Sequence, residues 1–383
     1  MIVAVDDAIP YWQEAFAEVG ELRPFSGRKL QSSHLRDVDA LVVRSVTRVD
    51  SALLDGSRVR FVGTATIGMD HMDLEYLRAR GIFFVNAAGS NANAVAEYVV
   101  AALEVVAARR SWTLERKSLA IIGVGNVGSR VERKARALGM SLHLCDPPLR
   151  ESTGDPKYLF LDDVLEADIL TFHVPLTTDG PYPTWHMLDG NLLGRLPADK
   201  FLINTSRGPV FSEPELKAAL ANRKLDGAVL DVWESEPRID YTLMELTEIG
   251  SPHIAGYSLD GKVRATEIIL EALCGQFGVA AAWDNSGLFP EPVHLGIPPG
   301  LRPQEAIRAA VLQAYDILRD DQQLRELRLV NPEQAALGFD RLRNEYPLRA
   351  EFRHFIVELP QEYSPLASTL RELGFQVRDM RAG

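Results

Sequence analysis

Three charged residues in the second half of the chain each follow a short apolar run, and together they could oxidise an alcohol. Arg207, Glu236 and His253 come after three successive runs that are typical of buried strands. The carboxyl ends of parallel strands meet at one edge of a sheet, where ligands bind. A histidine can take a hydroxyl proton, a carboxylate can hold its ring, and a guanidinium can grip a carboxylate. Each residue alone is more often structural, but the set predicts a catalytic site for a 2-hydroxy acid.

A glycine-rich turn upstream predicts the oxidant. Residues 121–128 read Ile-Ile-Gly-Val-Gly-Asn-Val-Gly, after an apolar run and before a helical pattern. In a dinucleotide-binding turn the first glycine, here Gly123, allows the tight bend. The second, Gly125, lets a pyrophosphate approach the backbone, and the third, Gly128, lets helix and strand pack closely. Amides at the start of the helix suit phosphate, so we expect a nicotinamide dinucleotide here.

The choice between NAD and NADP depends on Asp146. This residue ends the next apolar run, eighteen residues after Gly128. A carboxylate at this position accepts hydrogen bonds from the adenosine ribose hydroxyls and repels a 2′-phosphate. The predicted cofactor is therefore NAD, and Arg150 is the nearby basic residue that argues for NADP.

Short apolar runs alternate with helical patterns over most of the chain. Such alternation predicts an α/β fold with parallel sheets that are covered by helices on both faces. We expect two doubly wound domains: a flavodoxin-like substrate-binding domain of residues 1–94 with 263–283, and a Rossmann NAD-binding domain of residues 95–262. Long helices at about 93–110 and 263–277 are expected to connect them.

The composition changes after Gly278. A proline-rich stretch precedes patterns that predict helices at 303–319 and 365–373 and strands at 351–358 and 375–378. We therefore expect a third, small α+β domain over residues 284–383.

Composition and charge exclude several classes of function. The 383 residues carry a formal net charge of −12, which argues against nucleic-acid and anionic-membrane partners because both need a basic surface. No apolar stretch is long and uncharged enough to be expected to span a bilayer. The two cysteines imply no disulfide framework, so the reducing cytoplasm is the expected location. No cysteine and histidine spacing predicts a metal site.

The segments around the three charged residues resemble those of the D-isomer-specific 2-hydroxyacid dehydrogenases. This resemblance covers about residues 1–280 and rests on residues 204–208, 231–237 and 252–256. A closer resemblance, over the whole chain, is to members of that family that act on a phosphorylated four-carbon hydroxy acid. It rests on residues 42–47, 61–71, 179–182 and 253–258, and on a C-terminal extension similar to their dimerisation domain.

The resemblance implies roles for individual residues. Arg207 and Glu236 are implied as active-site residues and His253 as the proton donor and acceptor. Substrate contacts are implied at Ser45, Thr66 and Tyr257, and the C-terminal domain is implied to form a homodimer. Contacts with NAD are implied at Asn126, Val127, Asp146, Ser206, Arg207, Gly208, Asp231 and Gly256.

Two loops of the first domain also suit an anionic substrate by their own chemistry. Arg44 and Ser45 follow one predicted strand and Thr66 to Gly68 follow the next, so both loops are expected at the ligand-binding edge of the sheet. Backbone amides at Gly68 suit a carboxylate, while Arg44, Ser45 and Tyr257 suit a phosphate or hydroxyls.

Two other functions remain open at this point. One is a different 2-hydroxyacid dehydrogenase, such as an enzyme for 3-phosphoglycerate whose C-terminal domain is regulatory. The other is a protein that senses NAD without catalysis, as a corepressor does. The presence of Arg207, Glu236 and His253 argues against pure sensing, because sensing needs no proton relay.

Overall fold

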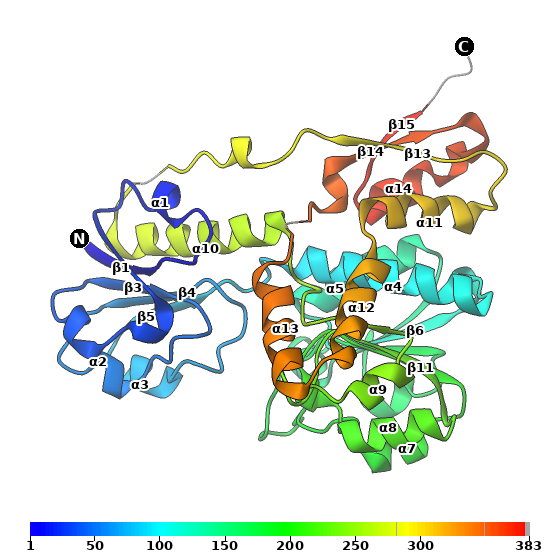
Figure 1. Ribbon diagram of the computed structural model, residues 1–383, viewed down its shortest axis with the longest axis horizontal. Helices are drawn as coiled ribbons and strands as arrows, with labels where there is room; N and C mark the ends of the chain where they lie inside the picture. Colours follow the sequence, from blue (N-terminus) through cyan, green and yellow to red (C-terminus); the bar gives the residue numbers. More distant parts are fainter. Residues whose placement is uncertain (281, 348, 380–383) are drawn as a thin grey trace. The chain divides into compact units, whose positions relative to one another are not determined.

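The computed structural model describes residues 1–280, 282–347 and 349–379. Its contacts divide the chain into two compact units, Met1–Asn91 with Ser258–Pro290 and Ala92–Tyr257 with Glu291–Gly383. Each unit is built on parallel sheets with flanking helices (Figure 1), which confirms the predicted α/β class. Among the described residues, no helix is both long enough and apolar enough to cross a membrane.

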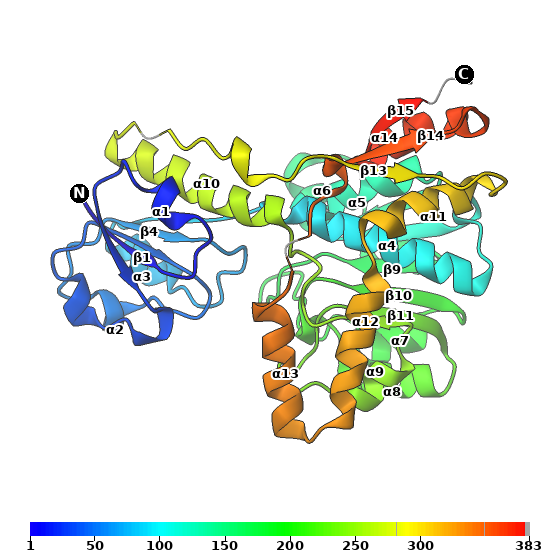
Figure 2. The ribbon, with the colours of Figure 1, turned by 45° about the horizontal axis from the view of Figure 1, so that its top comes forward.

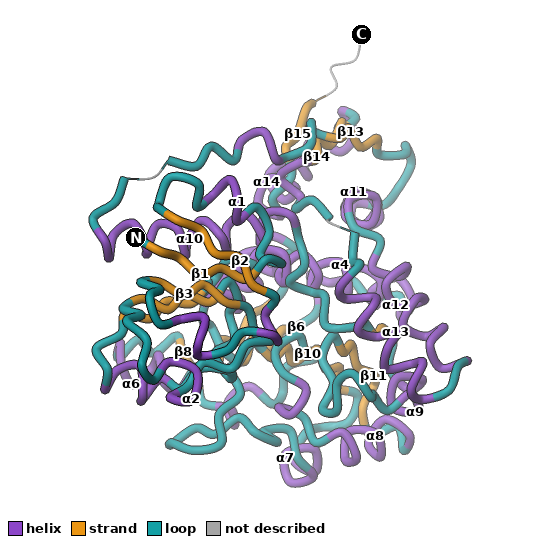
Figure 3. Tube along the Cα trace, turned by 60° about the vertical axis from the view of Figure 1, so that its left-hand side comes forward, coloured by secondary structure: helices purple, strands orange, loops and turns teal. Residues whose placement is uncertain are grey.

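The first unit contains a five-stranded parallel sheet in the order β2-β1-β3-β4-β5. This is the flavodoxin-like order that the sequence predicts. Figure 3 labels β1, β2 and β3 of this sheet. Its strands are β1 (Ile2–Asp6), β2 (Glu21–Phe25), β3 (Ala40–Val43), β4 (Phe61–Thr64) and β5 (Phe83–Asn86). Its helices are α1 (Trp12–Ala15), α2 (Ser51–Leu54), α3 (Leu74–Ala79) and α10 (Leu259–Phe277).

Alternation along β3 shows how this sheet is covered on both faces. Ala40 and Val42 belong to a core formed with Ile269 of α10, while Leu41 and Val43 belong to a second core formed with α2 and α3. Successive side chains of a strand point to opposite faces. The uninterrupted apolar run of β3 is therefore the consequence of burial on both sides.

The second unit contains a seven-stranded parallel sheet in the order β12-β11-β10-β9-β6-β7-β8, the doubly wound arrangement with one added strand. Its strands are β6 (Ser118–Ile122), β7 (Ser141–Cys145), β8 (Tyr158–Leu159), β9 (Ile169–Phe172), β10 (Lys200–Asn204), β11 (Leu225–Leu230) and β12 (Ile249–Gly250). Its helices are α4 (Ala92–Arg110), α5 (Asn126–Ala137), α6 (Pro147–Thr153), α7 (Gly190–Arg195), α8 (Glu213–Ala221) and α9 (Tyr241–Leu246). Helices α4 and α5 cover one face and α7, α8 and α9 the other (Figure 2).

The C-terminal residues form a small three-stranded parallel sheet in the order β13-β14-β15. The strands are β13 (Val293–Gly296), β14 (Phe355–Leu359) and β15 (Gln376–Asp379). The helices are α11 (Pro303–Ala314), α12 (Ile317–Glu326), α13 (Pro332–Asn344) and α14 (Ala367–Leu373).

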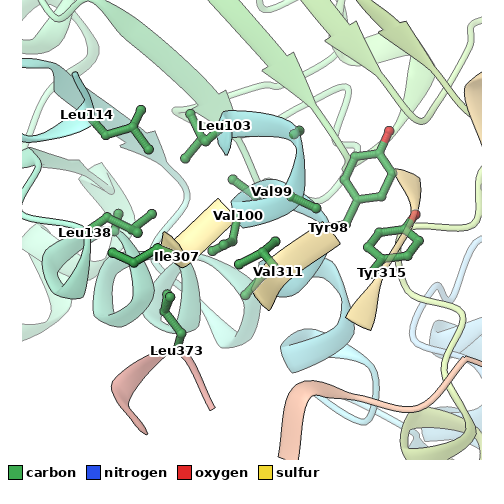
Figure 4. Close-up of a cluster of buried hydrophobic side chains, with 14 of the residues drawn as sticks. Tyr98, Val99, Val100, Leu103, Leu114, Leu138, Ile307, Val311, Tyr315 and Leu373 are labelled. Carbon is green, nitrogen blue, oxygen red and sulfur yellow. The ribbon is translucent and has the colours of Figure 1, made fainter. Parts of the chain in front are cut away.

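This C-terminal part shares one apolar core with the nucleotide-binding sheet. Ile307 and Val311 of α11 pack against Val99 and Val100 of α4, and Leu373 of α14 joins the same cluster (Figure 4). Fifteen of the nineteen residues of α4 are buried as a result. By contacts the C-terminal part thus groups with residues 92–257, although it has a sheet of its own. The division into three domains stays a prediction.

Two expectations for the C-terminal part are wrong. The helix expected at 303–319 is two helices, α11 and α12, because Tyr315 leaves the helical conformation and Asp316 caps the second helix by accepting from the Arg319 N–H. The strand expected at 351–358 begins at Phe355, after a short 3-10 turn. Helix α13, the part of α12 after residue 319, and strands β2, β8 and β13 were not expected.

Helix α4 carries a buried carboxylate that gives the fold a pH dependence. Glu104 is fully buried, and its Oε2 lies 3.5 Å from Arg308 Nε on α11. Burial raises the pKa of Glu104 to about 7, although Arg308 and Gln304 oppose the rise. A carboxyl whose pKa is raised on folding contributes stability that is present below its unfolded pKa and is lost as the pH rises through the folded pKa.

Replacing Glu104 by Gln is therefore expected to raise the melting temperature more at about pH 8 than at about pH 5. Glutamine stays neutral at both pH values and avoids the cost of ionising the buried carboxyl, on the order of 3 kcal/mol at the higher pH. Thermal unfolding of the Glu104→Gln protein at both pH values measures the effect, and the exposed Glu75, changed to Gln, is the matched control. An equal shift of melting temperature at the two pH values would contradict the prediction.

Candidate active site

Glu236 and His253 form a hydrogen-bonded pair at the carboxyl ends of β11 and β12. His253 Nδ1 lies 2.8 Å from Glu236 Oε2, and the Trp233 N–H donates to Glu236 Oε1 at 3.0 Å. Burial raises the pKa of Glu236, but the charge and hydrogen bond of His253, the Trp233 N–H and Arg343 outweigh it, so that the pKa is lowered. The Glu236 carboxylate therefore stays ionised and is hydrogen-bonded to Nδ1 of His253. The other ring nitrogen, Nε2, can then accept a proton from a substrate.

A buried aspartate fixes the backbone around His253. His253 has a left-handed φ of 59°, and its N–H donates to the Asp231 carbonyl at 2.7 Å. The Asp231 carboxylate accepts from the amides of Ile254 and Ala255 at 2.8 and 3.0 Å and from the Ser251 hydroxyl at 2.6 Å. Asp231 is only 1% exposed. In this structure its carboxylate braces the turn, and its contact with NAD stays a prediction.

Arg207 lies in a tight loop after β10. The Asn204 side chain accepts from the Ser206 N–H and hydroxyl at 3.0 and 2.8 Å and donates to the Arg207 carbonyl at 3.0 Å. A Cβ on Gly208 would lie 2.0 Å from the backbone of Trp233. The loop of Arg207 is therefore packed directly on the segment that holds Glu236, which brings the three predicted catalytic residues to neighbouring strand ends.

The glycine motif has the geometry that a dinucleotide needs. Gly123 has a φ of 86°, and a Cβ on Gly128 would lie 2.0 Å from the Gly123 carbonyl oxygen. A Cβ on Gly125 would meet nothing within 4 Å, so there is open space at this position. Gly125 caps α5 without a side-chain hydrogen bond, which leaves the first amides, at Asn126 and Val127, for phosphate oxygens.

Asp146 holds the glycine loop from the next strand. Its Oδ2 accepts from the Val124 N–H at 2.8 Å, and its Oδ1 accepts from the Leu149 N–H at 3.0 Å. Each carboxylate oxygen can accept more than one hydrogen bond. Asp146 therefore retains acceptor capacity for ribose hydroxyls, and the residues around α5 fit NAD.

The predicted substrate residues of the first unit lie together at one edge of its sheet. Because Val43 is paired with Thr64, the loops that begin with Arg44 and Ser45 and with Thr66 are neighbours. The Thr66 hydroxyl bonds Thr64 Oγ1 at 2.8 Å and donates to the Gly68 carbonyl at 3.3 Å. Arg44 Nε donates to the buried Asp6 at 3.2 Å.

Two further histidines have structural environments. His173 is held between the hydroxyls of Thr171 and Thr205, at 2.9 and 3.2 Å, and burial lowers its pKa to about 3. Burial also lowers the pKa of His71. Within the described part of the chain, no group of His, Cys, Asp and Glu side chains could hold a metal ion.

Tyr257 and Gly256 lie beside residues that the sequence did not connect with the site. The rings of Tyr257 and Tyr346 meet edge to face at 5.9 Å. Arg349 donates to the carbonyls of Ala255 and Tyr257, on either side of Gly256, at 2.6 and 3.0 Å. Arg343 lies 3.9 Å from Glu236. No local pattern could have revealed these contacts, because the arginines are more than ninety residues further along the chain than the groups they meet.

Comparisons with known proteins agree with this geometry. Residues 80–255 match the family model described as D-isomer specific 2-hydroxyacid dehydrogenase, NAD binding domain, and residues 295–374 match a domain of unknown function. The solved D-lactate dehydrogenase of Aquifex aeolicus, in complex with NAD and lactic acid, has a TM-score of 0.59 at 24% identity and covers 73% of this chain and 96% of its own. That likeness supports the fold.

Two curated relatives extend over nearly the whole chain. The erythronate-4-phosphate dehydrogenase of Hahella chejuensis is 42% identical over 98% of this chain and 99% of its own. That of Chromohalobacter salexigens is 43% identical over 99% of both. With an NAD-binding domain of the D-isomer-specific 2-hydroxyacid dehydrogenase type, the chain belongs to the erythronate-4-phosphate dehydrogenase family.

Proposed function

We propose that this protein uses NAD to oxidise 4-phospho-D-erythronate to (R)-3-hydroxy-2-oxo-4-phosphobutanoate, in the biosynthesis of pyridoxal phosphate (vitamin B6). The observation that carries the proposal is the hydrogen bond of 2.8 Å between His253 and Glu236. The chain also aligns over nearly its full length with curated relatives that are named for this substrate. Those names favour this substrate over 3-phosphoglycerate, and the His–Glu pair favours an enzyme over an NAD sensor.

The mechanism assigns one task to each catalytic side chain. His253 Nε2 takes the proton of the C2 hydroxyl, and Glu236 holds the ring through Nδ1 and stabilises the imidazolium that forms. Arg207 binds the carboxylate and the C2 oxygen and so polarises the carbonyl that develops. The glycine motif and Asp146 would hold NAD, which would supply the acceptor for the hydride that leaves C2.

The proposed substrate contacts follow from the chemistry of each predicted group. Arg44, Ser45 and Tyr257 supply a cation and hydroxyls that suit the phosphate and the free hydroxyl, and the amide of Gly68 with Thr66 suits the carboxylate. The arrangement of the Arg44 and Thr66 loops at one sheet edge supports this assignment.

Turnover across related acids tests the function. NADH formation is expected to show a kcat/KM for 4-phospho-D-erythronate at least on the order of 100-fold above those for D-erythronate, 3-phosphoglycerate and D-lactate, because a site built to hydrogen-bond a substrate rejects an acid that leaves its polar groups unpaired. NADP in place of NAD is expected to react poorly, since Asp146 repels its 2′-phosphate. A preference for 3-phosphoglycerate would overturn the substrate assignment.

The protein is further proposed to be a cytoplasmic homodimer that pairs through residues 284–383. Exposed apolar side chains in this part support the pairing: Val293, Leu329, Val330 and Leu337 are 45–76% exposed. Both cysteines are free, which suits a reducing compartment. Light scattering of the full chain tests the pairing, and the mass of a single chain at micromolar concentration would exclude it.

A further inference from the structure

An arginine of the C-terminal part reaches the catalytic pair. Arg343 lies in the last turn of α13, the helix that follows η7 (Leu327–Leu329) (Figures 1 and 2). Its Nη1 lies 3.9 Å from Glu236 Oε2, the same oxygen that holds His253 Nδ1 at 2.8 Å. The side chains of Arg343 and Glu236 are 29% and 18% exposed, so solvent screens their attraction only in part.

The same arginine is linked to Tyr257. Burial lowers the pKa of Arg343, but electrostatic interactions with Tyr257 and Glu236 and a hydrogen bond with the Tyr257 side chain outweigh it, so that the pKa is raised. Arg343 Nε is buried without a hydrogen-bond partner among the described residues. The cation is thus directed between a catalytic carboxylate and a predicted substrate residue.

The residues that follow Arg343 hold the loop that Tyr257 belongs to. Tyr346 packs on Tyr257 and donates to Asp320 Oδ2 at 2.9 Å, which fixes its own ring. Arg349 adds its hydrogen bonds to the carbonyls of Ala255 and Tyr257 and stacks over the Tyr315 ring at 4.0 Å. Tyr346 and Arg349 therefore tie the chain that follows Arg343 to the loop of Tyr257.

We propose that Arg343 is a positioning residue of the active site, which orients the Tyr257 hydroxyl and keeps the Glu236 carboxylate directed at His253. This inference rests on the proposed function. It makes the C-terminal part a contributor to the catalytic site of the same chain. Arg343 acts through Glu236 and Tyr257, whereas Arg207 and His253 act on the substrate itself.

The charge of Arg343 is expected to influence the pH range of activity. The charged and titratable groups around Glu236 are His253 from the loop after β12, Arg343 from α13 and the carboxyl of Glu213, while Asp231 faces His253 and Arg343. Of these, Arg343 is the cation that opposes binding of an additional proton to the Glu236–His253 pair. Without it the pair keeps that proton to a higher pH, and a protonated pair cannot accept the substrate proton.

The test replaces Arg343 by Met and by Lys in the full chain, with the exposed Arg341 of the same helix, changed to Met, as the matched control. Arg343→Met is expected to lower kcat/KM about 30-fold, through both a lower kcat and a higher KM, as for loss of a charged hydrogen bond. The acid limb of its kcat/KM profile is expected about 0.5 pH unit above that of the wild type. Arg343→Lys is expected to return the acid limb to the pH of the wild type and to restore part of kcat/KM. Arg341→Met is expected to match the wild type in both.

The outcomes separate this proposal from the substrate assignment. All variants are compared on the acid that the wild type oxidises best, so a wrong substrate leaves the comparison valid. The proposal would be overturned if Arg343→Met had the same kcat/KM and the same acid limb as Arg341→Met. If Arg343→Met does not fold, Arg343→Lys and Arg343→Gln are compared instead. The proposal would also be overturned if the Gln variant had the same kcat/KM and the same acid limb as the Lys variant.

Discussion

Replacing His253 by Asn is expected to lower kcat for oxidation of the hydroxy acid by about 10³-fold. Asparagine tolerates the left-handed backbone at this position, so the turn around Asp231 is retained. What is lost is the acceptor for the C2 hydroxyl proton and the partner of Glu236 at 2.8 Å. Because the proton acceptor is gone, the fall in wild-type kcat/KM at low pH should also disappear from the variant. Stopped-flow and steady-state NADH formation measure both effects.

A second histidine–carboxylate pair provides the control. His294 Nδ1 lies 2.9 Å from Glu358 Oε1 on the exposed β13 and β14 strands. His294→Asn removes a pair of the same kind and is expected to leave kcat within about twofold, as for a surface ion pair. The affinity for NAD, measured by fluorescence titration, is expected to stay unchanged in His253→Asn. Full turnover of His253→Asn would show that another group takes the proton.

Replacing Gly128 by Val is expected to weaken NAD binding by at least about 100-fold and to lower the melting temperature. A Cβ at this position would lie 2.0 Å from the Gly123 carbonyl oxygen and 3.2 Å from Ile121 Cγ2, so α5 would have to move away from β6. That movement displaces the amides that face the pyrophosphate. A loss of about 3 kcal/mol of binding free energy corresponds to the expected factor in the dissociation constant. Calorimetric titration with NAD and thermal unfolding measure the two effects.

Two other glycines separate packing from ligand approach. Gly125→Ala meets no protein atom within 4 Å, so it is expected to weaken NAD binding without lowering the melting temperature. Gly275, exposed in α10 with nothing within 4 Å, is expected to gain slightly in stability as Ala, by up to about 1 kcal/mol, with NAD binding unchanged. A Gly128→Val protein that binds NAD like the wild type would contradict the role of this contact.

The buried strands were predictable from sequence because burial on both faces leaves uninterrupted apolar runs. The apolar runs at 40–43 and 169–172 predict strands with the same bounds as β3 and β9. Strand β2 was missed because it lies at the edge of its sheet, where Glu21, Arg23 and Pro24 are tolerated. Strand β13 was missed for a similar reason, since its proline-rich surroundings resemble a linker.

The parts of the site that lie in contiguous segments could be predicted from the sequence. The glycine motif and the residues after β10, β11 and β12 are each contiguous segments, and parallel topology brings their ends together. The bracing role of the Asp231 carboxylate depends on amides more than twenty residues away. The approach of Arg343 to Glu236 depends on how α13 packs, and no periodicity in the sequence encodes that contact.

Helix α4 has a consequence for how the protein can be cut or shortened. It is buried almost all round because the nucleotide-binding sheet covers one side and α11 the other. A chain truncated after residue 283 would expose Val99 and Val100 to water. Removal of the C-terminal part would therefore yield an aggregation-prone fragment and not a minimal dehydrogenase. Residues 92–257 and 291–379 are expected to unfold as one cooperative block.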